Sequence, residues 1–321
     1  MQIGVVANVL SDKSLKEALQ IFSSMGIEKI EPGCGGFAGK AHIDPEKLLS
    51  DVNKLNELQN TLQESGISIS ALSCHGNPIH PDKEKALAYH DDMCNTVRLA
   101  QKLGVDTITC FSGCPGDCEQ SKNPNWVTCA WPDDYLKILE YQWDKVLIPY
   151  WKKFVPFARD FGVNKIAFEL HPGFCIYNVD SMLRLREAVG PELGVNFDPS
   201  HLLWQGMDPI TVIRAFKGMI FHVHAKDVCI DHNNTSRNGV LDTKHYSDES
   251  NRSWLFRTVG FGNDAKYWKD IFSELRKIGY DGTISIEHED SIINRKEGLQ
   301  HAVDMVRSCA IFAPRSGMWW A

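Results

Sequence analysis

The stretch GVNFDPSHLLWQGMDPITVIRAFKGMIFHVHAKD, residues 194–227, contains the pattern that decides the fold. It holds two short apolar runs, and a polar residue closes each of them, Asp198 in the first and His224 in the second. Between the runs, Pro209–Lys217 has the apolar spacing of an amphipathic helix. A strand, a helix and a second strand, with polar residues at the carboxyl ends of the strands, are typical of a βαβ unit.

The rest of the chain repeats this unit. Eight apolar segments have the length and composition of strands: Ile3–Val6, Ile27–Glu31, Ser68–Ser73, Thr107–Phe111, Lys165–Leu170, Gly194–Asp198, Met219–His224 and Thr283–Glu287. Each precedes a segment with helical periodicity: Leu15–Met25, Pro45–Ser65, Lys83–Leu103, Asp134–Phe161, Ser181–Val189, Pro209–Lys217, Ala265–Ile278 and Ile293–Ala310. Glycines follow six of these helices, where a left-handed C-cap is wanted: Gly26, Gly66, Gly104, Gly162, Gly218 and Gly279.

Eight alternations of strand and helix predict an α/β fold, a (β/α)8 TIM barrel that spans residues 1–321 as a single domain. A doubly wound open sheet is the alternative, but such a sheet rarely needs eight regular repeats. Two loops are longer than a barrel requires, Gly113–Pro132 after strand four and Cys229–Gly262 after strand seven. Both leave the carboxyl ends of their strands, so we expect them to cover the active site. Solvated excursions or oligomer contacts are the other reading.

Composition and charge exclude several classes of protein. The chain has a net charge of −7, 43% apolar and 23% charged residues, which is ordinary for a globular protein but unsuited to a nucleic-acid partner. No stretch approaches the roughly 20 apolar residues that cross a membrane, and the start MQIGVV does not resemble a signal peptide. We therefore expect a soluble, cytoplasmic protein whose ten cysteines are reduced. The apolar tail, about 313–321, is expected to pack on a partner, in a homo-oligomer or in a hetero-complex with a small subunit.

Polar residues close strands five to eight: Glu169, Asp198, His224 and Glu287. The first two intervals between them, 29 and 26 residues, are close to one barrel repeat of about 30 residues, and the third, 63, adds the long loop after strand seven. A structural salt bridge explains any one of these residues as well as a functional role does. Because a buried carboxylate without a partner is costly, four such groups at one barrel mouth predict a divalent cation.

The order Glu, Asp-x-x-His, His-x-Lys-Asp, Glu on strands five to eight resembles the xylose-isomerase-like sugar (phosphate) isomerase and epimerase barrels. The resemblance covers nearly the whole chain, and DPSHLLWQG and HVHAKD are its most specific parts. It implies one divalent metal held by Glu169, Asp198, His224 and Glu287, with Glu169 and Glu287 also serving as the proton-transfer pair. Three oxygen ligands and one nitrogen favour Mn, with Mg, Co and Zn as alternatives.

Further candidates surround this set. His171 and His201 are expected to act as acid, base or substrate contacts, although simple packing is the alternative for each. Residues expected to bind substrate are His75, Lys226, Asp227, Trp126 and Trp131. His222 is expected to be a core histidine, and Asn8, Glu31 and Ser112 are further strand-end residues that face the same mouth.

These residues predict a metal-dependent isomerase or epimerase that abstracts a proton next to a metal-bound carbonyl or hydroxyl of a sugar or keto sugar. A lyase on the same site is the alternative, either an inosose-type dehydratase or a deglycosidase subunit that eliminates an aglycone from a 3-keto-glycoside. The long loop after strand seven favours this lyase reading. DNA cleavage of the endonuclease IV type is disfavoured, because it needs additional histidines and a basic face. A barrel that only binds ligand is disfavoured by the complete ligand set.

Overall fold

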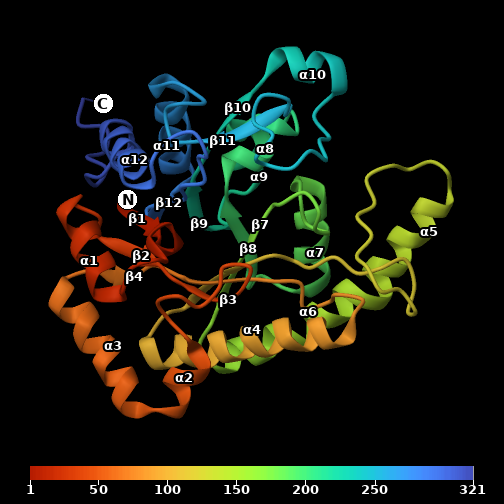
Figure 1. Cartoon of the computed structure of the whole chain (residues 1–321), viewed down its shortest axis with the longest axis horizontal. Coiled ribbons are helices and arrows are strands. Elements are labelled where there is room, and N and C mark those ends of the chain that lie inside the picture. Colours follow the sequence, from red (N-terminus) through yellow and green to blue (C-terminus); the bar gives the residue numbers. More distant parts are fainter. Residues whose placement is uncertain (321) are drawn as a thin grey trace.

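Ten short strands form one parallel sheet in the computed structural model, which describes residues 1–320 (Figure 1). The strands are β1 (Gln2–Val6), β2 (Lys29–Glu31), β3 (Gly33–Gly36), β4 (Ser68–Ile69), β5 (Leu72–His75), β6 (Thr107–Cys110), β7 (Lys165–Glu169), β8 (Leu193–Phe197), β9 (Ile220–Ala225) and β12 (Thr283–Ile286). Their order in the sheet is β3-β5-β6-β7-β8-β9-β12-β1-β2-β4.

Two interrupted strands explain how ten strands make a ring of eight. Pro32 has no amide hydrogen and separates β2 from β3, while residues 70–71 separate β4 from β5. β2 pairs with β4 and β3 pairs with β5, so the two ends of the sheet are halves of neighbouring strands. The pairing continues across the break, because the Ser70 amide donates to the Ile30 carbonyl (2.9 Å) and the Ser73 amide to that of Pro32 (3.0 Å). The sheet therefore closes, and the expected (β/α)8 TIM barrel is confirmed.

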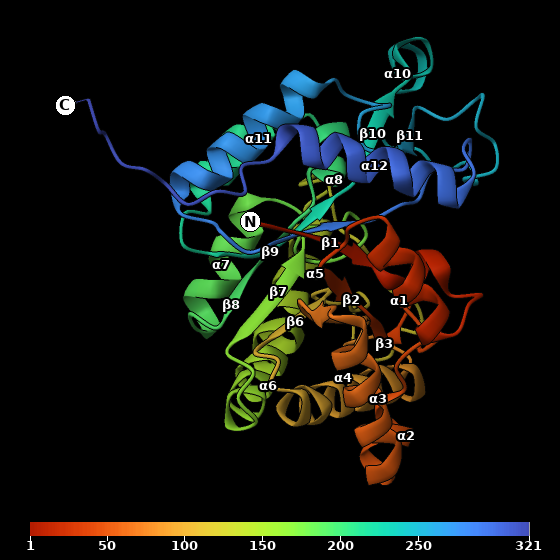
Figure 2. The ribbon, with the colours of Figure 1, turned by 90° about the vertical axis from the view of Figure 1, so that its left-hand side faces the viewer.

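Helices cover the outside of the ring, and their apolar faces pack on the strands in one large core (Figure 2). The α-helices are α1 (Leu15–Ser24), α2 (Pro45–Ser50), α3 (Val52–Ser65), α4 (Lys83–Leu103), α5 (Asp134–Tyr141), α6 (Ile148–Asp160), α7 (Val179–Val189), α8 (Pro199–Trp204), α9 (Pro209–Ala215), α10 (His232–Asn238), α11 (Ala265–Ile278) and α12 (Arg295–Cys309). A 3₁₀ turn, η1 (Ala7–Leu10), follows β1, and a π-helical segment, η2 (Gln142–Leu147), joins α5 to α6. Among the helices of residues 1–320, none has the length and apolarity needed to cross a bilayer.

Two local differences from the expected helices have physical causes. The helix expected over Pro45–Ser65 is two helices, because Asp51 leaves the helical conformation (φ −138°, ψ 101°) and its carboxylate caps α3. The short helix α8 was not foreseen; the Asp198 carboxylate caps it by accepting the Ser200 amide (2.8 Å), and Pro199 occupies its first turn. This helix fixes the backbone directly behind one of the expected metal ligands.

The segment after β9 was expected to be a polar loop, but it contains an antiparallel hairpin, β10 (Asp227–Ile230) and β11 (Trp254–Arg257), with α10 between the strands. The hairpin has a small core of its own, in which Val228, Trp254 and Phe256 pack against Trp204 of α8. The loop after β6 runs irregularly to α5 and projects with it from the barrel, and the chain after α12 leaves the body as a tail (Figures 1 and 2). Ala321, the last residue of the expected tail, lies outside the described residues.

Candidate metal centre

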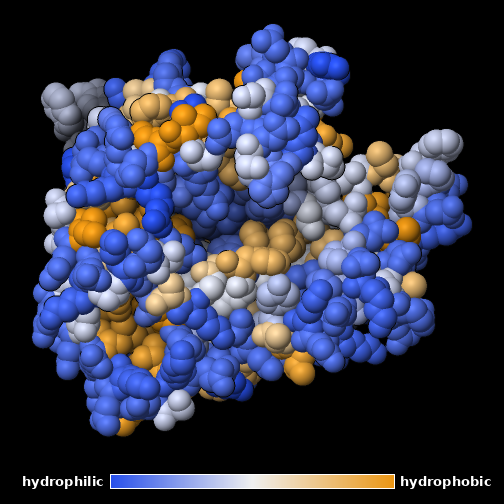
Figure 3. All heavy atoms as spheres, viewed as in Figure 1, coloured by the Kyte–Doolittle hydropathy of each residue, from blue (hydrophilic) through white to orange (hydrophobic). Residues whose placement is uncertain are grey.

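A small polar pocket of about 150 Å³ lies at the carboxyl ends of the strands. Its lining includes His75, Glu169, His171, His224, Lys226 and Glu287. In the view of Figure 3 the surface is hollowed between the part that holds β10 and β11 and the part that holds α4. The sequence-predicted residues of strands three, five, seven and eight thus meet in one place.

The four expected metal ligands are brought together. Glu169 ends β7, Asp198 follows β8, His224 lies in β9 and Glu287 follows β12. One potential ligand atom from each lies within 4.8 Å of all the others. The parallel register sets this level, since Glu169 pairs with Asn196 on β8, and His224 pairs with Ser285, two residues before Glu287.

Two of these ligands keep buried polar atoms without a hydrogen-bond partner, Nδ1 of His224 and Oδ2 of Asp198. Nδ1 of His224 lies 3.0 Å from Oε2 of Glu287 and 3.5 Å from Oε2 of Glu169. Burial raises the pKa of Asp198, against the opposing effects of His201 and Lys226. Unpartnered buried polar atoms are uncommon and call for an explanation such as an ion. Three carboxylates and one imidazole fit a divalent cation at this point.

Glu31, at the end of β2, is fully buried and orients His224 from behind. Its Oε2 accepts hydrogen bonds from Nε2 of His224 (2.9 Å), Nε2 of His222 (2.8 Å) and Oγ of Ser285 (2.9 Å), and its Oε1 accepts one from Oγ1 of Thr109 (2.6 Å). Because Nε2 of His224 donates to Glu31, Nδ1 is the ring nitrogen that faces the other three candidate ligands. Burial lowers the pKa of His224, but the carboxylates of Glu31 and Glu287 outweigh it and raise the pKa well above its ordinary value, so an ion bound here would displace a proton from Nδ1. Burial alone would raise the pKa of Glu31, but His224 and His222 hold it well below its usual range.

Two histidines flank Glu169. Nε2 of His201 donates to Oε1 of Glu169 (2.9 Å), and Nε2 of His75 lies 3.1 Å from Oε2. Burial would raise the pKa of Glu169, but these two histidines hold it well below its usual range. His75 also lines the pocket, whereas His201 is buried behind Glu169 and lies 3.4 Å from Oδ2 of Asp198. The structure therefore places His201 against two carboxylates rather than in the pocket lining.

The ammonium group of Lys226 lies among the carboxylates of the site. Its Nζ lies 3.2 Å from Oε2 of Glu287, 2.5 Å from Oε2 of Glu289 and 4.3 Å from the centre of the Phe256 ring. Burial lowers the pKa of Lys226, but Glu287 and Glu289 outweigh it and raise the pKa well above its ordinary value. In turn, Lys226 and His224 overcome the burial of Glu287 and lower its pKa to about 2. The pocket thus keeps an ammonium group beside a carboxylate.

His171 lines the pocket as a neutral imidazole. Its Nδ1 lies 2.6 Å from the carbonyl oxygen of Pro172 and donates to it, so Nε2 is left as the acceptor. Burial and the neighbouring His201 lower the pKa of His171 to about 3. This arrangement gives a ring nitrogen that can accept a hydrogen bond but resists protonation.

Three residues expected to bind substrate lie away from the pocket. Both oxygens of the buried Asp227 carboxylate accept hydrogen bonds from the protein. Oδ2 accepts from the amides of Gly260, Gly262 and Asn263 and from the Trp268 indole. Oδ1 accepts from the Val228 amide and the Asn263 side chain. Asp227 therefore holds the segment that follows β11. Trp131 is 80% exposed, and Trp126 packs on Tyr177 in a different cavity, beside η2 and α7.

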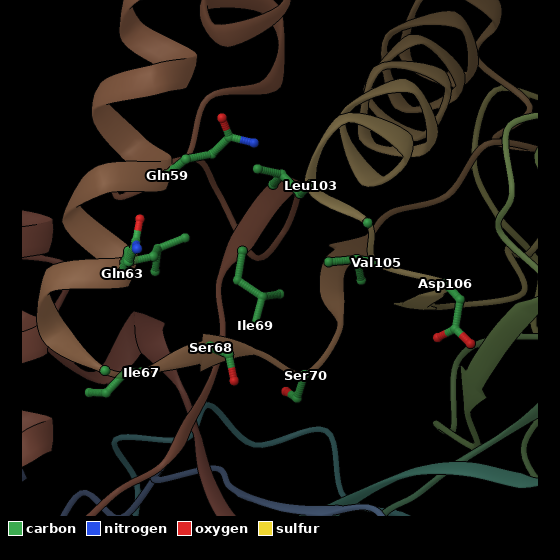
Figure 4. Close-up of a pocket in the computed structure, with 12 residues that line it drawn as sticks. Gln59, Gln63, Ile67, Ser68, Ile69, Ser70, Leu103, Val105 and Asp106 are labelled. Atoms are coloured by element: carbon green, nitrogen blue, oxygen red, sulfur yellow. The ribbon is translucent and has the colours of Figure 1, made fainter.

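A second, larger cavity of about 520 Å³ lies at the other end of the barrel, where α3 and α4 end and β4 and β6 begin (Figure 4). Its lining is made of amide, hydroxyl and aliphatic side chains with one carboxylate, Asp106. That carboxylate is already paired with Lys165 (2.8 Å). The grouping of titratable residues at the carboxyl ends makes the polar pocket the candidate site.

Sequence reasoning underestimated two carboxylates, Glu31 and Glu289. Glu31 was considered only as a strand-end residue facing the mouth, although it closes an apolar strand in the same way as Glu169. Glu289 was not considered; it follows Glu287 by two residues, a spacing that keeps two side chains on one side of an extended segment.

Comparison with known proteins agrees with this geometry. A family model described as "Xylose isomerase-like TIM barrel" matches residues 19–309. The uncharacterized protein YfiH of Bacillus subtilis is 38% identical over 309 residues, covering 96% of this chain and 98% of that protein. An inosose dehydratase of Geobacillus thermodenitrificans is 29% identical over 151 residues, about half of each chain (47% and 48%).

Solved structures share the fold at low sequence identity. The IOLI protein, described with a bound zinc atom, aligns with a TM-score of 0.64 at 19% identity, covering 96% of this chain and 99% of that one. A D-tagatose 3-epimerase-like protein aligns with a TM-score of 0.62 at 19% identity and the same coverage. The family match covers most of the chain and agrees with the closed barrel. The chain therefore belongs to the xylose isomerase-like TIM barrel family.

Proposed function

We propose that the chain is a divalent-metal-dependent enzyme that moves protons on a sugar or keto sugar, as an isomerase or epimerase. The observation that carries the proposal is the convergence of Glu169, Asp198, His224 and Glu287 within 4.8 Å, with two buried atoms that lack a protein partner. Family membership supports a sugar-modifying enzyme, because proteins similar to this chain include a sugar epimerase-like protein and dehydratases of inosose.

The four residues would hold the ion, which when bound supplies a Lewis acid that polarises a carbonyl and acidifies the adjacent C–H. Manganese or magnesium is our first choice from the ligand chemistry, because three of the four ligands are carboxylates. The zinc named for the IOLI protein keeps zinc among the candidates.

Side chains of the protein would carry out the proton transfers. Glu169 lies on β7 and Glu287 follows β12, with β8 and β9 between those strands, so the two carboxylates reach the pocket from separate strands of the ring. One carboxylate takes a proton from a substrate carbon, and the other, which must begin this step as the neutral acid, delivers a proton to the opposite face. Lys226, kept charged beside Glu287 (3.2 Å), stabilises negative charge that develops on a substrate oxygen.

A lyase acting at the same site is the second candidate, and His171 is the observation that favours it. Its Nδ1 donates to Pro172, so Nε2 is an acceptor in the pocket lining that does not depend on Glu169. Because a pKa of about 3 makes His171 a weak base, it would take a proton only from a carbon that a bound ion has strongly acidified. An elimination needs a base at one carbon and an acid at its neighbour, and His171 with a protonated group opposite would supply that pair.

Metal content and isotope exchange test the proposal together. Protein purified without chelator should hold one divalent ion, His224→Ala should lose it, and the matched control His301→Ala, an exposed histidine on α12, should retain it. Ketoses, inososes and 3-keto-glycosides in D₂O should include one substrate that gains deuterium. Glu169→Gln and Glu287→Gln should keep much of the metal and lose on the order of 10²–10⁴ in rate.

Equal metal content in wild type and His224→Ala would overturn the metal assignment. Deuterium gain without an elimination product indicates an isomerase or epimerase, whereas an unsaturated product or a freed aglycone indicates the lyase. A lyase in which Glu287→Gln stays active and His171→Ala does not would transfer the base role to His171.

A further inference from the structure

An apolar cavity of about 510 Å³ adjoins the polar pocket. Its walls are mostly aromatic: Phe37, Phe111, Phe174, Tyr246, Leu255 and Phe256. We call this cavity the aromatic chamber. Phe37 follows β3, Phe111 follows β6 and Phe174 follows β7, while the other three residues belong to the insertion that carries β10 and β11.

The chamber is continuous with the polar pocket. Phe37, Phe111, His171 and Glu289 line both cavities. The polar pocket alone, about 150 Å³, is smaller than the usual ligand pocket of about 300–1,000 Å³. The chamber is more than three times as large and lies within the usual range of ligand pockets, about 300–1,000 Å³.

The aromatic walls are ordered into two stacked pairs but remain open to solvent. Phe111 and Phe174 stack with ring centres 4.2 Å apart and an angle of 18°, and Tyr246 and Phe256 stack at 5.8 Å and 18°. Phe37 is 63% exposed and Tyr246 is 48% exposed. Exposed aromatic surface around a cavity is unfavourable in water and marks a place where an apolar group binds.

Apart from Glu289, which lines both cavities, the charged groups belong to the polar pocket. Lys226 lies over one face of Phe256 (4.3 Å), and its ammonium is neutralised by Glu287 and Glu289. Hydroxyl-bearing groups therefore find partners on the polar side, whereas the chamber offers aromatic and aliphatic surface. A ligand that matches both cavities has a polar ring joined to an apolar, planar group.

We propose that the aromatic chamber is a binding subsite for an aromatic or other apolar substituent carried by the sugar, so that the substrate is a glycoside with a keto group on its sugar ring rather than a free sugar. The proposal rests on the proposed function to the extent that the polar pocket receives the sugar ring. Tyr246 and Leu255 are then specificity-determining residues, because they line the chamber and not the polar pocket.

Binding of two glycosides that differ only in the substituent tests the subsite. Calorimetric titrations with 4-nitrophenyl β-D-glucopyranoside and methyl β-D-glucopyranoside, with and without added Mn²⁺, compare the dissociation constants. Burial of an aromatic ring should make the aryl glycoside bind on the order of tenfold more tightly than the methyl glycoside. Tyr246→Ser and Leu255→Ser should reduce this ratio to about one- to threefold, and Leu87→Ser, a 59% exposed leucine on α4, should leave it unchanged.

The outcomes separate the subsite from the proposed function. Equal affinities for the two glycosides, absence of binding by either, or an aryl preference that survives both chamber variants would overturn the subsite. An aryl preference that depends on Tyr246 and Leu255, in a protein that binds no metal and exchanges no deuterium, would support the subsite while the proposed function fails. Sedimentation velocity completes the test: if the chamber variants lower the oligomeric state instead of the aryl affinity, a second copy covers the chamber and the subsite is overturned.

Discussion

Replacing Glu31 with glutamine tests whether one buried carboxylate sets the orientation of the candidate metal ligand His224. The variant keeps the size of the side chain and one oxygen but removes the charge. Wild-type Glu31 accepts four hydrogen bonds, three at Oε2 and one at Oε1. If the amide oxygen takes the place of Oε2, the imidazoles of His222 and His224 keep an acceptor, but a neutral one.

The magnitude follows from that change. A hydrogen bond to a charged group contributes about 1.5–3 kcal/mol, and a neutral one about 0.5–1.5 kcal/mol, so the two imidazole bonds together lose about 2–3 kcal/mol. Removing a charge from a fully buried position offsets part of this loss. We expect the free energy of unfolding of the metal-free protein to fall by about 1–3 kcal/mol. Metal affinity should fall about 10–100-fold, because His224 loses the carboxylate that orients it.

Urea denaturation in the presence of chelator, followed by tryptophan fluorescence, measures the first quantity, and metal titration at neutral pH measures the second. Glu297→Gln is the matched control, because its carboxylate on α12 is 65% exposed and its nearest basic group is 4.0 Å away. The control should change the free energy of unfolding by less than about 0.5 kcal/mol. Wild-type metal affinity and stability in Glu31→Gln would refute the role assigned to Glu31.

Three further predictions concern Asp227, Asp242 and Trp131, none of which lines the polar pocket. Asp227→Asn should lower Tm by several degrees and expose the segment 258–263 to proteolysis, because one carboxylate oxygen that accepts up to four protein donors becomes an amide; unchanged Tm would contradict this. Burial raises the pKa of Asp242, but hydrogen bonds from the Lys244 and Ser253 amides lower it to about 2. The contribution of the Asp242 carboxylate to the stability of the fold is therefore complete above about pH 4 and is lost as pH falls toward 2. Pepsin should therefore cut residues 240–253 increasingly over that window in wild type, and Asp242→Asn should be cut at the upper end of the window already. Trp131→Ala should leave kcat/KM within about twofold, because an 80% exposed side chain outside both cavities contacts no bound sugar; a larger loss would restore its expected substrate role.

Local patterns were enough to predict the barrel and to select the four candidate ligands that the structure brings together. Strands β7, β8, β9 and β12 are short apolar runs closed by one polar residue, and both features are visible within five or six neighbouring residues. Parallel strands in a barrel place their carboxyl ends at one face, so the shared position of those polar residues follows from the repeat. The hairpin of β10 and β11 could not be predicted in the same way, because its buried residues pack on Trp204 of α8 rather than on the barrel core.

The partners of the ligands depend on contacts around the ring, which local patterns do not encode. Glu31 meets His222 and His224 across separations of 191 and 193 residues, and it does so because β12, near the end of the chain, pairs with β1, so that β9, β12, β1 and β2 are successive strands of the ring. A sheet in which β12 did not pair with β1 would keep the run of polar strand ends but would separate Glu31 from β9. The Nε2 donation that turns Nδ1 of His224 toward the other candidate ligands is therefore a consequence of the pairing between β12 and β1.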